Sequence, residues 1–273
     1  VVCLAAAGPI VEERVQFTNN HWVISSADLK QEFGIERVKL MNDFEAIAYS
    51  VPFLAEQDRL PIGLPEPKSL HAGDFMVGIL GPGTGLGAAG LLRRGDLFIP
   101  IVGEASHGGF SPETKAQLDL LTTLRERFDR VSSERLVSGQ GLENIYWALS
   151  QIHGEKKPQL SAAEIFRHSQ DGSDPRALEA VQLFYEILGQ VAGDLALTLK
   201  AEHGIFIAGG IAQRYPEILL ASRFRTAFES KGRHRSLMER IPTQLITHQQ
   251  PGLLGASYCA MQLVPGRLSQ VSA

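Results

Sequence analysis

Asn42 and Asp43 are the residues of this sequence that could activate an alcohol. Phosphoryl transfer to an alcohol needs a carboxylate that accepts the hydroxyl proton and orients the oxygen for attack, and a neighbouring amide can hold another hydroxyl. Both residues follow the apolar run Val38–Met41, which predicts a strand that ends where they begin. A second interpretation fits equally well: Asp43 caps a helix expected over Phe44–Tyr49, a frequent use of Asp.

Glu104 and His107 lie in a glycine-rich segment and could bind the hydroxyl groups of a sugar. Glutamate accepts hydrogen bonds, and histidine donates or accepts them. The same residue types could ligate a metal, but no cysteine cluster or second His-Glu pair accompanies them, so we predict no protein metal site. A solvated loop is the plainer interpretation. Glu134 also has a plain role, since a carboxylate in the first turn of a helix interacts favourably with the helix dipole.

The glycine-rich segment Gly81–Gly87 follows the apolar run Phe75–Leu80 and could bind phosphate. Glycines let the backbone approach an anion, successive N–H groups can surround it, and Thr84 adds a hydroxyl donor. A tight turn between two strands of a meander explains the same residues. The segment lacks the ending of a Walker A motif and the spacing of a dinucleotide fingerprint. Gly209-Gly210 also ends an apolar strand, where it could approach a nucleotide or simply supply a turn with positive φ.

The elements that must position these residues alternate between strands and helices. Apolar runs predict strands at Val1–Ala5, Val38–Met41, Phe75–Leu80, Ala88–Leu92, Leu97–Ile101 and Ile205–Ala208, and we expect Ile10–Phe17 to pair with the first as a hairpin. Capping signals and periodic apolar residues predict helices after Ser25, Ser161 and Asp174, around Leu118–Phe128 and over Leu253–Leu263, with Leu118 and Leu178 on the apolar faces. This mixture predicts an α/β fold, whose ligands bind at the carboxyl ends of strands.

Composition restricts the classes of partner. The chain has 273 residues, 44% of them apolar, and a formal net charge of −4, which gives no reason to expect nucleic acid or an anionic membrane. No apolar run is long enough to span a bilayer. The two cysteines, Cys3 and Cys259, could pair on paper, but so sparse a pair is more typical of a reduced cytoplasm.

Several short segments follow one another in a specific order, although each is a weak signal by itself. They are Thr18–Trp22, Asn42–Phe44, Gly83–Gly87, Gly103–His107, Ser133–Arg135, Ser138–Leu142, Ile207–Ile211, Phe224–Arg233 and Pro251–Gly255. In this order they resemble the bacterial ATP-dependent glucokinases over essentially the whole chain. The resemblance implies the actin-like, ribonuclease-H-like fold of sugar kinases, with two α/β domains around a cleft. We expect a small domain of residues 1–52 plus 248–273 and a large domain of residues 53–247.

The resemblance also implies a reaction and the residues for it. The γ-phosphoryl group of ATP would pass to the 6-hydroxyl of glucose, giving glucose 6-phosphate and ADP in glycolysis. Asp43 matches the catalytic base, and the glucose-binding positions match Asn42, Asp43, Glu104, His107 and Glu134. The ATP phosphate loop matches Gly83, Thr84 and Gly85, and the segment near adenosine matches Gly209 and Gly210. Members of the family use Mg²⁺ and are commonly cytoplasmic homodimers.

This sequence departs from the family pattern in two places. The family begins with a strand and an Asp-x-Gly-Gly-Thr phosphate loop ahead of the strand that corresponds to Val1–Ala5, and that loop does not occur here. We therefore expect a chain truncated at its N-terminus, with little kinase activity in this form. Ala105-Ser106 stands where the family usually carries Gly-Gly. A related group with a Cys-rich zinc site is excluded, because Cys3 and Cys259 are the only cysteines.

Two other functions remain open from the sequence. One is a kinase for another hexose or an amino sugar, since Glu104, His107 and Glu134 favour free hydroxyls without excluding epimers. The other is a sugar-kinase-like regulator, which would usually carry a DNA-binding helix-turn-helix at its N-terminus. Asp43 argues against the regulator, because a protein that only binds sugar has no need of a base.

Overall fold

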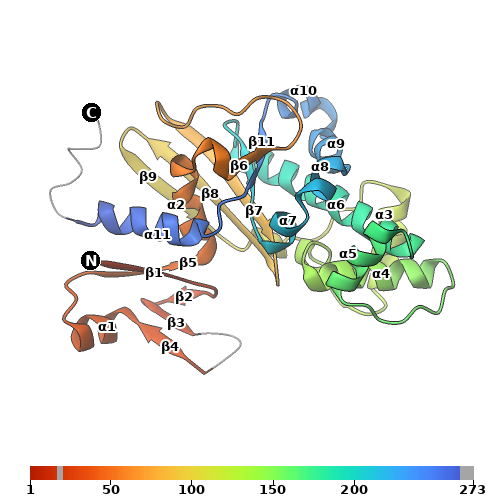
Figure 1. Cartoon of the computed structure of the whole chain (residues 1–273), viewed down its shortest axis with the longest axis horizontal. Helices are drawn as coiled ribbons and strands as arrows, with labels where there is room; N and C mark the ends of the chain where they lie inside the picture. Colours follow the sequence, from red (N-terminus) through yellow and green to blue (C-terminus); the bar gives the residue numbers. More distant parts are fainter. Residues whose placement is uncertain (17–20, 265–273) are drawn as a thin grey trace.

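The computed structural model describes residues 1–16 and 21–264 (Figure 1). The strands are β1 (Val2–Ala6), β2 (Ile10–Val11), β3 (Arg14–Gln16), β4 (Val23–Ser25), β5 (Val38–Asn42), β6 (Arg59–Pro61), β7 (Phe75–Pro82), β8 (Leu86–Arg94), β9 (Leu97–Val102), β10 (Ile205–Ile207) and β11 (Thr243–Ile246). The helices are α1 (Ser26–Phe33), α2 (Asp43–Ser50), α3 (Lys115–Leu124), α4 (Gly139–Ile152), α5 (Ala162–Asp171), α6 (Pro175–Leu199), α7 (Gly210–Arg214), α8 (Pro216–Ala221), α9 (Phe224–Glu229), α10 (Arg235–Met238) and α11 (Pro251–Gln262). The predicted α/β class is confirmed. Residues 18–20 of the segment Thr18–Trp22, and the end of the expected small domain from residue 265, lie outside the described residues.

The largest sheet has the strand order β6-β11-β10-β7-β8-β9. β10 runs parallel to both β11 and β7, whereas β6, β8 and β9 pair antiparallel to their neighbours. Alternate residues of a strand point to opposite faces. Ile205 and Ile207 therefore join the core under α4, α5 and α6, while Phe206 joins the core under α2 and α11 (Figure 1).

β1 pairs in parallel with β5, with Val2 opposite Val38 and Ala6 opposite Asn42. The predicted hairpin between Val1–Ala5 and Ile10–Phe17 is therefore wrong. β2 turns back on β3 instead, through Glu12 and Glu13, which both have positive φ. The partial alternation that suggested one strand comes from two short strands and the turn between them, and β4 completes this small antiparallel sheet.

The predicted helix starts are confirmed. The Ser25 hydroxyl accepts a hydrogen bond from the Asp28 N–H at the start of α1, Ser161 and Glu164 form a capping box on α5, and Asp174 caps α6 ahead of Pro175. These side chains satisfy N–H groups that have no partner inside the helix.

The predicted buried faces of α3 and α6 are partly wrong. Leu118 is 53% exposed and Leu178 is 44% exposed, whereas Leu120 is fully buried. The inward face of α3 begins with Gln117, a polar residue that is buried because it donates a hydrogen bond to Glu186 and accepts one from Gln190. Because a polar residue occupies a buried position, the spacing of apolar residues along the sequence does not indicate which face of α3 is buried.

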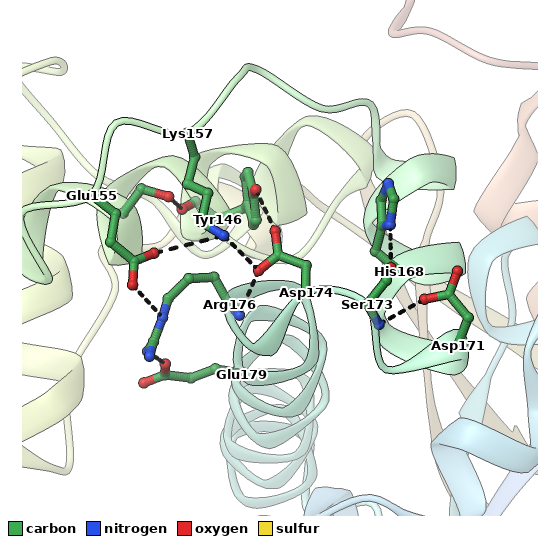
Figure 2. A network of polar contacts seen from close by, with 10 residues as sticks. Tyr146, Glu155, Lys157, His168, Asp171, Ser173, Asp174, Arg176 and Glu179 are labelled. Atoms are coloured by element: carbon green, nitrogen blue, oxygen red, sulfur yellow. Dashed lines mark hydrogen bonds and ion pairs between the residues drawn. The ribbon is translucent and has the colours of Figure 1, made fainter.

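A compact charge network surrounds the start of α6 (Figure 2). The Asp174 carboxylate accepts hydrogen bonds from the Tyr146 hydroxyl at 2.7 Å, from the Lys157 ammonium at 3.1 Å and from the Arg176 N–H at 2.9 Å. The Arg176 guanidinium in turn forms ion pairs with Glu155 and Glu179. Each carboxylate of the network therefore has a cationic neighbour.

Helix α11 packs against α2 and β1 (Figure 1). The contact with α2 is unusually close at Gly255, where a Cβ atom would lie 1.7 Å from the carbonyl oxygen of Ala46. Only glycine allows two helices to approach in this way. The predicted helix after Pro251-Gly252 is confirmed, and its glycine fixes the position of α2. Among the described residues, no helix is long and apolar enough to cross a membrane.

Candidate active site

The start of α2 carries Asn42 and Asp43 at the carboxyl end of β5. The Phe44 N–H donates to the Asn42 side-chain oxygen at 2.8 Å and to the Asp43 carboxylate at 2.9 Å. Asn42 occupies the cap position and Asp43 is the first helical residue, so the interpretation of Asp43 as the cap is wrong. Capping uses the side-chain oxygen of Asn42 and leaves its NH₂ group as a donor, while Asp43 lies in the first turn, where a helix favours negative charge.

The pKa of Asp43 lies above its ordinary value. Burial of the carboxylate is the main cause, and the negative charge of Glu104 adds to it. Hydrogen bonds from the Phe44 N–H and the Asn42 side chain act in the opposite direction but do not cancel the shift. A carboxylate with a raised pKa is a stronger base, which is the property that proton removal from an alcohol requires.

Phe44 joins this helix start to the hairpin of β7 and β8. Its ring lies where side chains of Gly81 and Gly87 would be: a Cβ atom on Gly87 would come within 1.8 Å of the ring, and one on Gly81 within 2.6 Å. The two glycines thus form a seat for Phe44. This packing holds Asp43 beside the turn of the hairpin.

The turn between β7 and β8 contains Gly83, Thr84 and Gly85. Pro82 pairs with Leu86, and the Gly83 N–H donates to the Gly85 carbonyl at 2.8 Å, so the interpretation as a tight turn of a meander is correct in geometry. The Gly83 carbonyl also accepts a hydrogen bond from the Gly139 N–H at 2.9 Å. Thr84 is exposed at the tip, where its hydroxyl is available to a ligand.

Glu134 lies directly against this turn. One carboxylate oxygen accepts a hydrogen bond from the Leu86 N–H at 2.9 Å, and a Cβ atom on Gly85 would lie 2.6 Å from the same oxygen. The role that the sequence suggested, stabilising a helix start, is therefore incomplete. Glu134 sits in a 3₁₀ turn, Ser133–Arg135, whose position is fixed because the Ser138 hydroxyl donates to the Glu134 carbonyl.

His107 lies between Glu104 and Glu134. Its Nε2 atom is 3.8 Å from a Glu104 carboxylate oxygen and 4.0 Å from the other carboxylate oxygen of Glu134. The segment is fixed because the Ser133 N–H donates to the Gly108 carbonyl and Arg130 donates to the His107 carbonyl. The side chains of Glu104 and His107 remain 75% and 53% exposed, which leaves them accessible to a ligand.

Gly209 lies next to the same hairpin. Its φ is +87°, so the prediction of a turn with positive φ is confirmed. A Cβ atom there would lie 2.4 Å from the carbonyl oxygen of Pro82, and Gly210 begins α7. The Gly209-Gly210 pair thus adjoins the strand end that leads into Gly83.

The structure therefore brings the sequence-predicted residues into one chain of contacts, which we call the acidic site: Asn42, Asp43, Gly83, Thr84, Gly85, Glu104, His107, Glu134, Gly209 and Gly210. Within the described part of the chain, no Lys or Arg forms an ion pair with Asp43, Glu104 or Glu134. Nor do these residues form a group of three or more His, Cys, Asp or Glu side chains that could hold a metal by themselves.

Sequence reasoning missed the residues that support this site. Phe44 appeared only as part of a motif, and its ring is what links Asp43 to the hairpin. Ser138 and Gly139 also hold the site, through Glu134 and Gly83 respectively. The available signal was that glycines recur where a bulky side chain such as Phe44 packs against them. This signal can be interpreted only after the pairing of the strands is known.

Known proteins share this arrangement of sequence and fold. The sequence model of the family described as Glucokinase matches residues 1–263. A glucokinase of Nitrobacter hamburgensis is 44% identical over 252 residues, which cover 92% of this chain and 78% of that protein. The chain belongs to the glucokinase family.

Solved glucokinase structures agree with this assignment. The structure of a glucokinase from an Antarctic psychrotroph has a TM-score of 0.87 and 34% identity, and the match covers 94% of this chain and 79% of that one. A glucokinase from Balamuthia mandrillaris, solved in complex with glucose, has a TM-score of 0.81 and 24% identity, with 95% and 77% covered. The family resemblance and the α/β sugar kinase fold are therefore confirmed. The acidic site lies entirely within the region that the glucokinase family model matches.

Proposed function

We propose that Asp43 is the general base of the glucokinase reaction in this chain. Membership of the family assigns the reaction, transfer of a phosphoryl group from ATP to glucose with formation of glucose 6-phosphate and ADP. The observation that supports Asp43 is its place between the sugar-facing carboxylates and the glycine turn, together with a raised pKa. Asp43 accepts the proton of the 6-hydroxyl as that oxygen attacks the γ-phosphorus. The bond between the γ-phosphorus and ADP breaks, and ADP is the leaving group.

Glucose binding is assigned in this proposal to Asn42, Asp43, Glu104, His107 and Glu134. Glu104 and Glu134 accept hydrogen bonds from sugar hydroxyls, and His107 between them donates or accepts according to its tautomer. Glu134 has one oxygen committed to the Leu86 N–H, so the oxygen that faces His107 is the one for the sugar. Because the site is acidic, a neutral polyol suits it better than an anionic sugar phosphate.

ATP is assigned to the other side of Asp43. Gly83, Thr84 and Gly85 are assigned to the phosphates. The Gly83 N–H is committed to the Gly85 carbonyl, so the donors for the phosphates are the N–H groups of Thr84 and Gly85 and the Thr84 hydroxyl. Gly209-Gly210 lies next to that turn, where the nucleoside would follow. Mg²⁺ typically binds proteins through one or two carboxylates together with substrate phosphates and water. Bound in this way it neutralises phosphate charge.

Three wider expectations belong to the same proposal. The domain division into residues 1–52 plus 248–273 and 53–247 is supported by the packing of α11 on α2 and β1. A homodimer is supported by the edge strand β9, on which Leu97, Ile99 and Ile101 are exposed. A cytoplasmic location accords with the family and with free thiols at Cys3 and Cys259.

The proposal is tested on a form of the protein that carries the family's first phosphate loop, by a coupled ADP assay with glucose, mannose, fructose and N-acetylglucosamine. We expect the highest kcat/KM for glucose, because polar groups left unpaired by another sugar make a site reject it. Comparable kcat/KM values for glucose, mannose and fructose would contradict the sugar assignment. Glucose binding in calorimetry without ADP formation would favour the sugar-kinase-like regulator instead.

A further inference from the structure

The two cysteines of the chain meet between its first strand and its last described helix. Cys3 lies on β1 and Cys259 on α11, and both thiols are free. β1 and α11 pack against each other, and both side chains lie in the same hydrophobic cluster, close enough for the two thiols to interact. Cys259 is buried, at 3% exposure, whereas Cys3 is partly exposed. A reagent therefore reaches the pair from the Cys3 side.

Charged groups surround this thiol pair. Lys39 on β5 forms an ion pair with Glu45 of α2 at 2.8 Å, and its ammonium lies 5.1 Å from the ring centre of Tyr49. Lys39, Glu45 and Tyr49 all act electrostatically on Cys259 or are acted on by it. The pair thus lies beside a cation that can stabilise a thiolate.

We propose that Cys3 and Cys259 are a redox-active dithiol that forms an intramolecular disulfide by exchange with a small disulfide such as glutathione disulfide. The Cys3 sulfur attacks one sulfur of glutathione disulfide, and a glutathione thiolate leaves. The Cys259 thiolate then attacks the Cys3 sulfur of the mixed disulfide and expels the second glutathione thiolate. The protein loses two electrons and two protons, and glutathione disulfide is reduced to two glutathione molecules.

The local electrostatics support the second step, in which Cys259 attacks. The hydrogen bond from Cys3 lowers the pKa of Cys259 to about 7 against the opposing effect of burial, and Lys39 acts in the same direction. Cys3 keeps its proton in that hydrogen bond, so its own pKa is raised.

Closure of the disulfide would tether β1 to α11, and α11 is the helix that holds α2 through Gly255. The cross-link joins residues near the two ends of the described chain. A long closed loop restricts the unfolded chain strongly, so the oxidised protein should unfold at a higher temperature than the reduced protein.

The test treats the reduced protein with glutathione disulfide at pH 7, alkylates remaining thiols, and measures the intact mass and the peptide map. We expect wild-type protein to lose two hydrogens, to resist alkylation and to yield a linked Cys3–Cys259 peptide. We also expect its Tm to rise and to return to the starting value after dithiothreitol. Unreacted thiols, a stable mixed disulfide with glutathione or a disulfide-linked dimer would each overturn the proposal.

Matched variants separate the roles of the sulfurs and the cation. Cys259→Ser should stop at the mixed disulfide on Cys3, and Cys3→Ser should react slowly because Cys259 is buried. Lys39→Met should slow closure about fivefold at pH 7 by reducing the thiolate fraction, and Lys39→Arg should restore the rate. Closure at the same rate in all Lys39 variants would show that proximity alone drives the reaction and would refute the role of the cation. The Tm of each variant in its reduced form checks that the variant is folded.

Discussion

The molecule contains two groups of carboxylates that differ in how their charge is balanced. Around the start of α6, Asp174, Glu155 and Glu179 have Lys157 and Arg176 as partners (Figure 2). In the acidic site, Asp43, Glu104 and Glu134 have only His107 nearby among the described residues. The charges of the first group are balanced within the protein, whereas in the second group Glu104 and His107 are open to solvent.

The pKa values of the two aspartates reflect this difference. Burial acts to raise the pKa of Asp174, but hydrogen bonds from Tyr146, Lys157 and the Arg176 N–H outweigh it and hold the pKa below its ordinary value. Burial also raises the pKa of Asp43, and there the neighbouring Glu104 adds to the effect. The same residue type at a helix start therefore has a lowered pKa in one place and a raised pKa in the other, which accords with a stabilising role for Asp174 and with the proton transfer that we propose for Asp43.

The sharpest test of this contrast is Asp43→Asn, made in a form of the protein that carries the family's first phosphate loop. The amide keeps the shape of the side chain but cannot accept the proton, so kcat should fall by about 10²–10⁴-fold. The Tm should stay the same or rise slightly, because the folded state no longer carries a carboxylate whose charged form is penalised. Steady-state kinetics and thermal unfolding measure both. A variant within about tenfold of wild-type kcat would show that Asp43 is only a helix residue.

The opposite result is expected for Asp174→Ala. Loss of the cap and of the acceptor for the buried Tyr146 hydroxyl should lower the free energy of unfolding by about 1–3 kcal/mol while kcat is retained. The matched control is Asp171→Ala, because Asp171 is exposed and also caps a local N–H, that of Ser173. Urea denaturation should show a clearly smaller loss for the control. Equal losses would mean that the buried network adds nothing to stability.

A smaller effect is expected for Gly85→Ala. The new Cβ atom would lie 2.6 Å from the Glu134 carboxylate oxygen, so Glu134 must move and lose its bond to the Leu86 N–H. The KM for glucose should rise about tenfold, since one hydrogen bond to a charged group is worth about 1.5–3 kcal/mol. Gly252→Ala is the control, because nothing lies within 4 Å of a Cβ atom there. Unchanged glucose KM in Gly85→Ala would remove Glu134 from the sugar site.

The pH dependence offers the finest distinction. The pKa of Asp43 is raised, so the acid limb of kcat/KM should lie above the ordinary Asp value of about 3.9. The pKa of Asp174 is lowered, so its stabilisation is present above the unfolded-state pKa and is lost as pH falls through the folded-state pKa. Activity should therefore fall at a higher pH than stability does. Profiles of kcat/KM and of Tm against pH check this, and coincident acid limbs would contradict it.

Much of the fold could be predicted because the local sequence signals, such as helix caps, mark elements that the folded structure contains. Ser161 with Glu164, and Asp174 with Pro175, place two helix starts correctly through short-range hydrogen bonds. The hairpin of Val1–Ala5 was predicted wrongly because strand pairing is a long-range property. β1 pairs with a parallel strand more than thirty residues further along the chain, and parallel strands need a long crossover connection. The predicted burial of Leu118 was wrong for a related reason: Gln117 is buried instead, because its hydrogen-bond partners lie on α6.

The candidate site was predicted from the order of motifs, not from its geometry. Nothing in the sequence shows that Glu134 binds the Leu86 N–H or that Phe44 fits between Gly81 and Gly87. These contacts join segments that are distant along the chain, so they become visible only after the strands have been paired. The roles of the individual residues stay predictions until the kinetic tests above are made.

The close contact between Gly255 and Ala46 has a consequence for biosynthesis. Helix α2, with Asp43 at its start, emerges from the ribosome long before α11, which must pack against it. At about 5–20 residues per second, the intervening stretch of roughly two hundred residues takes about 10–40 s to translate. During that interval the apolar surface of α2 has no helix to cover it, which makes the nascent chain a client for chaperones that bind exposed apolar segments.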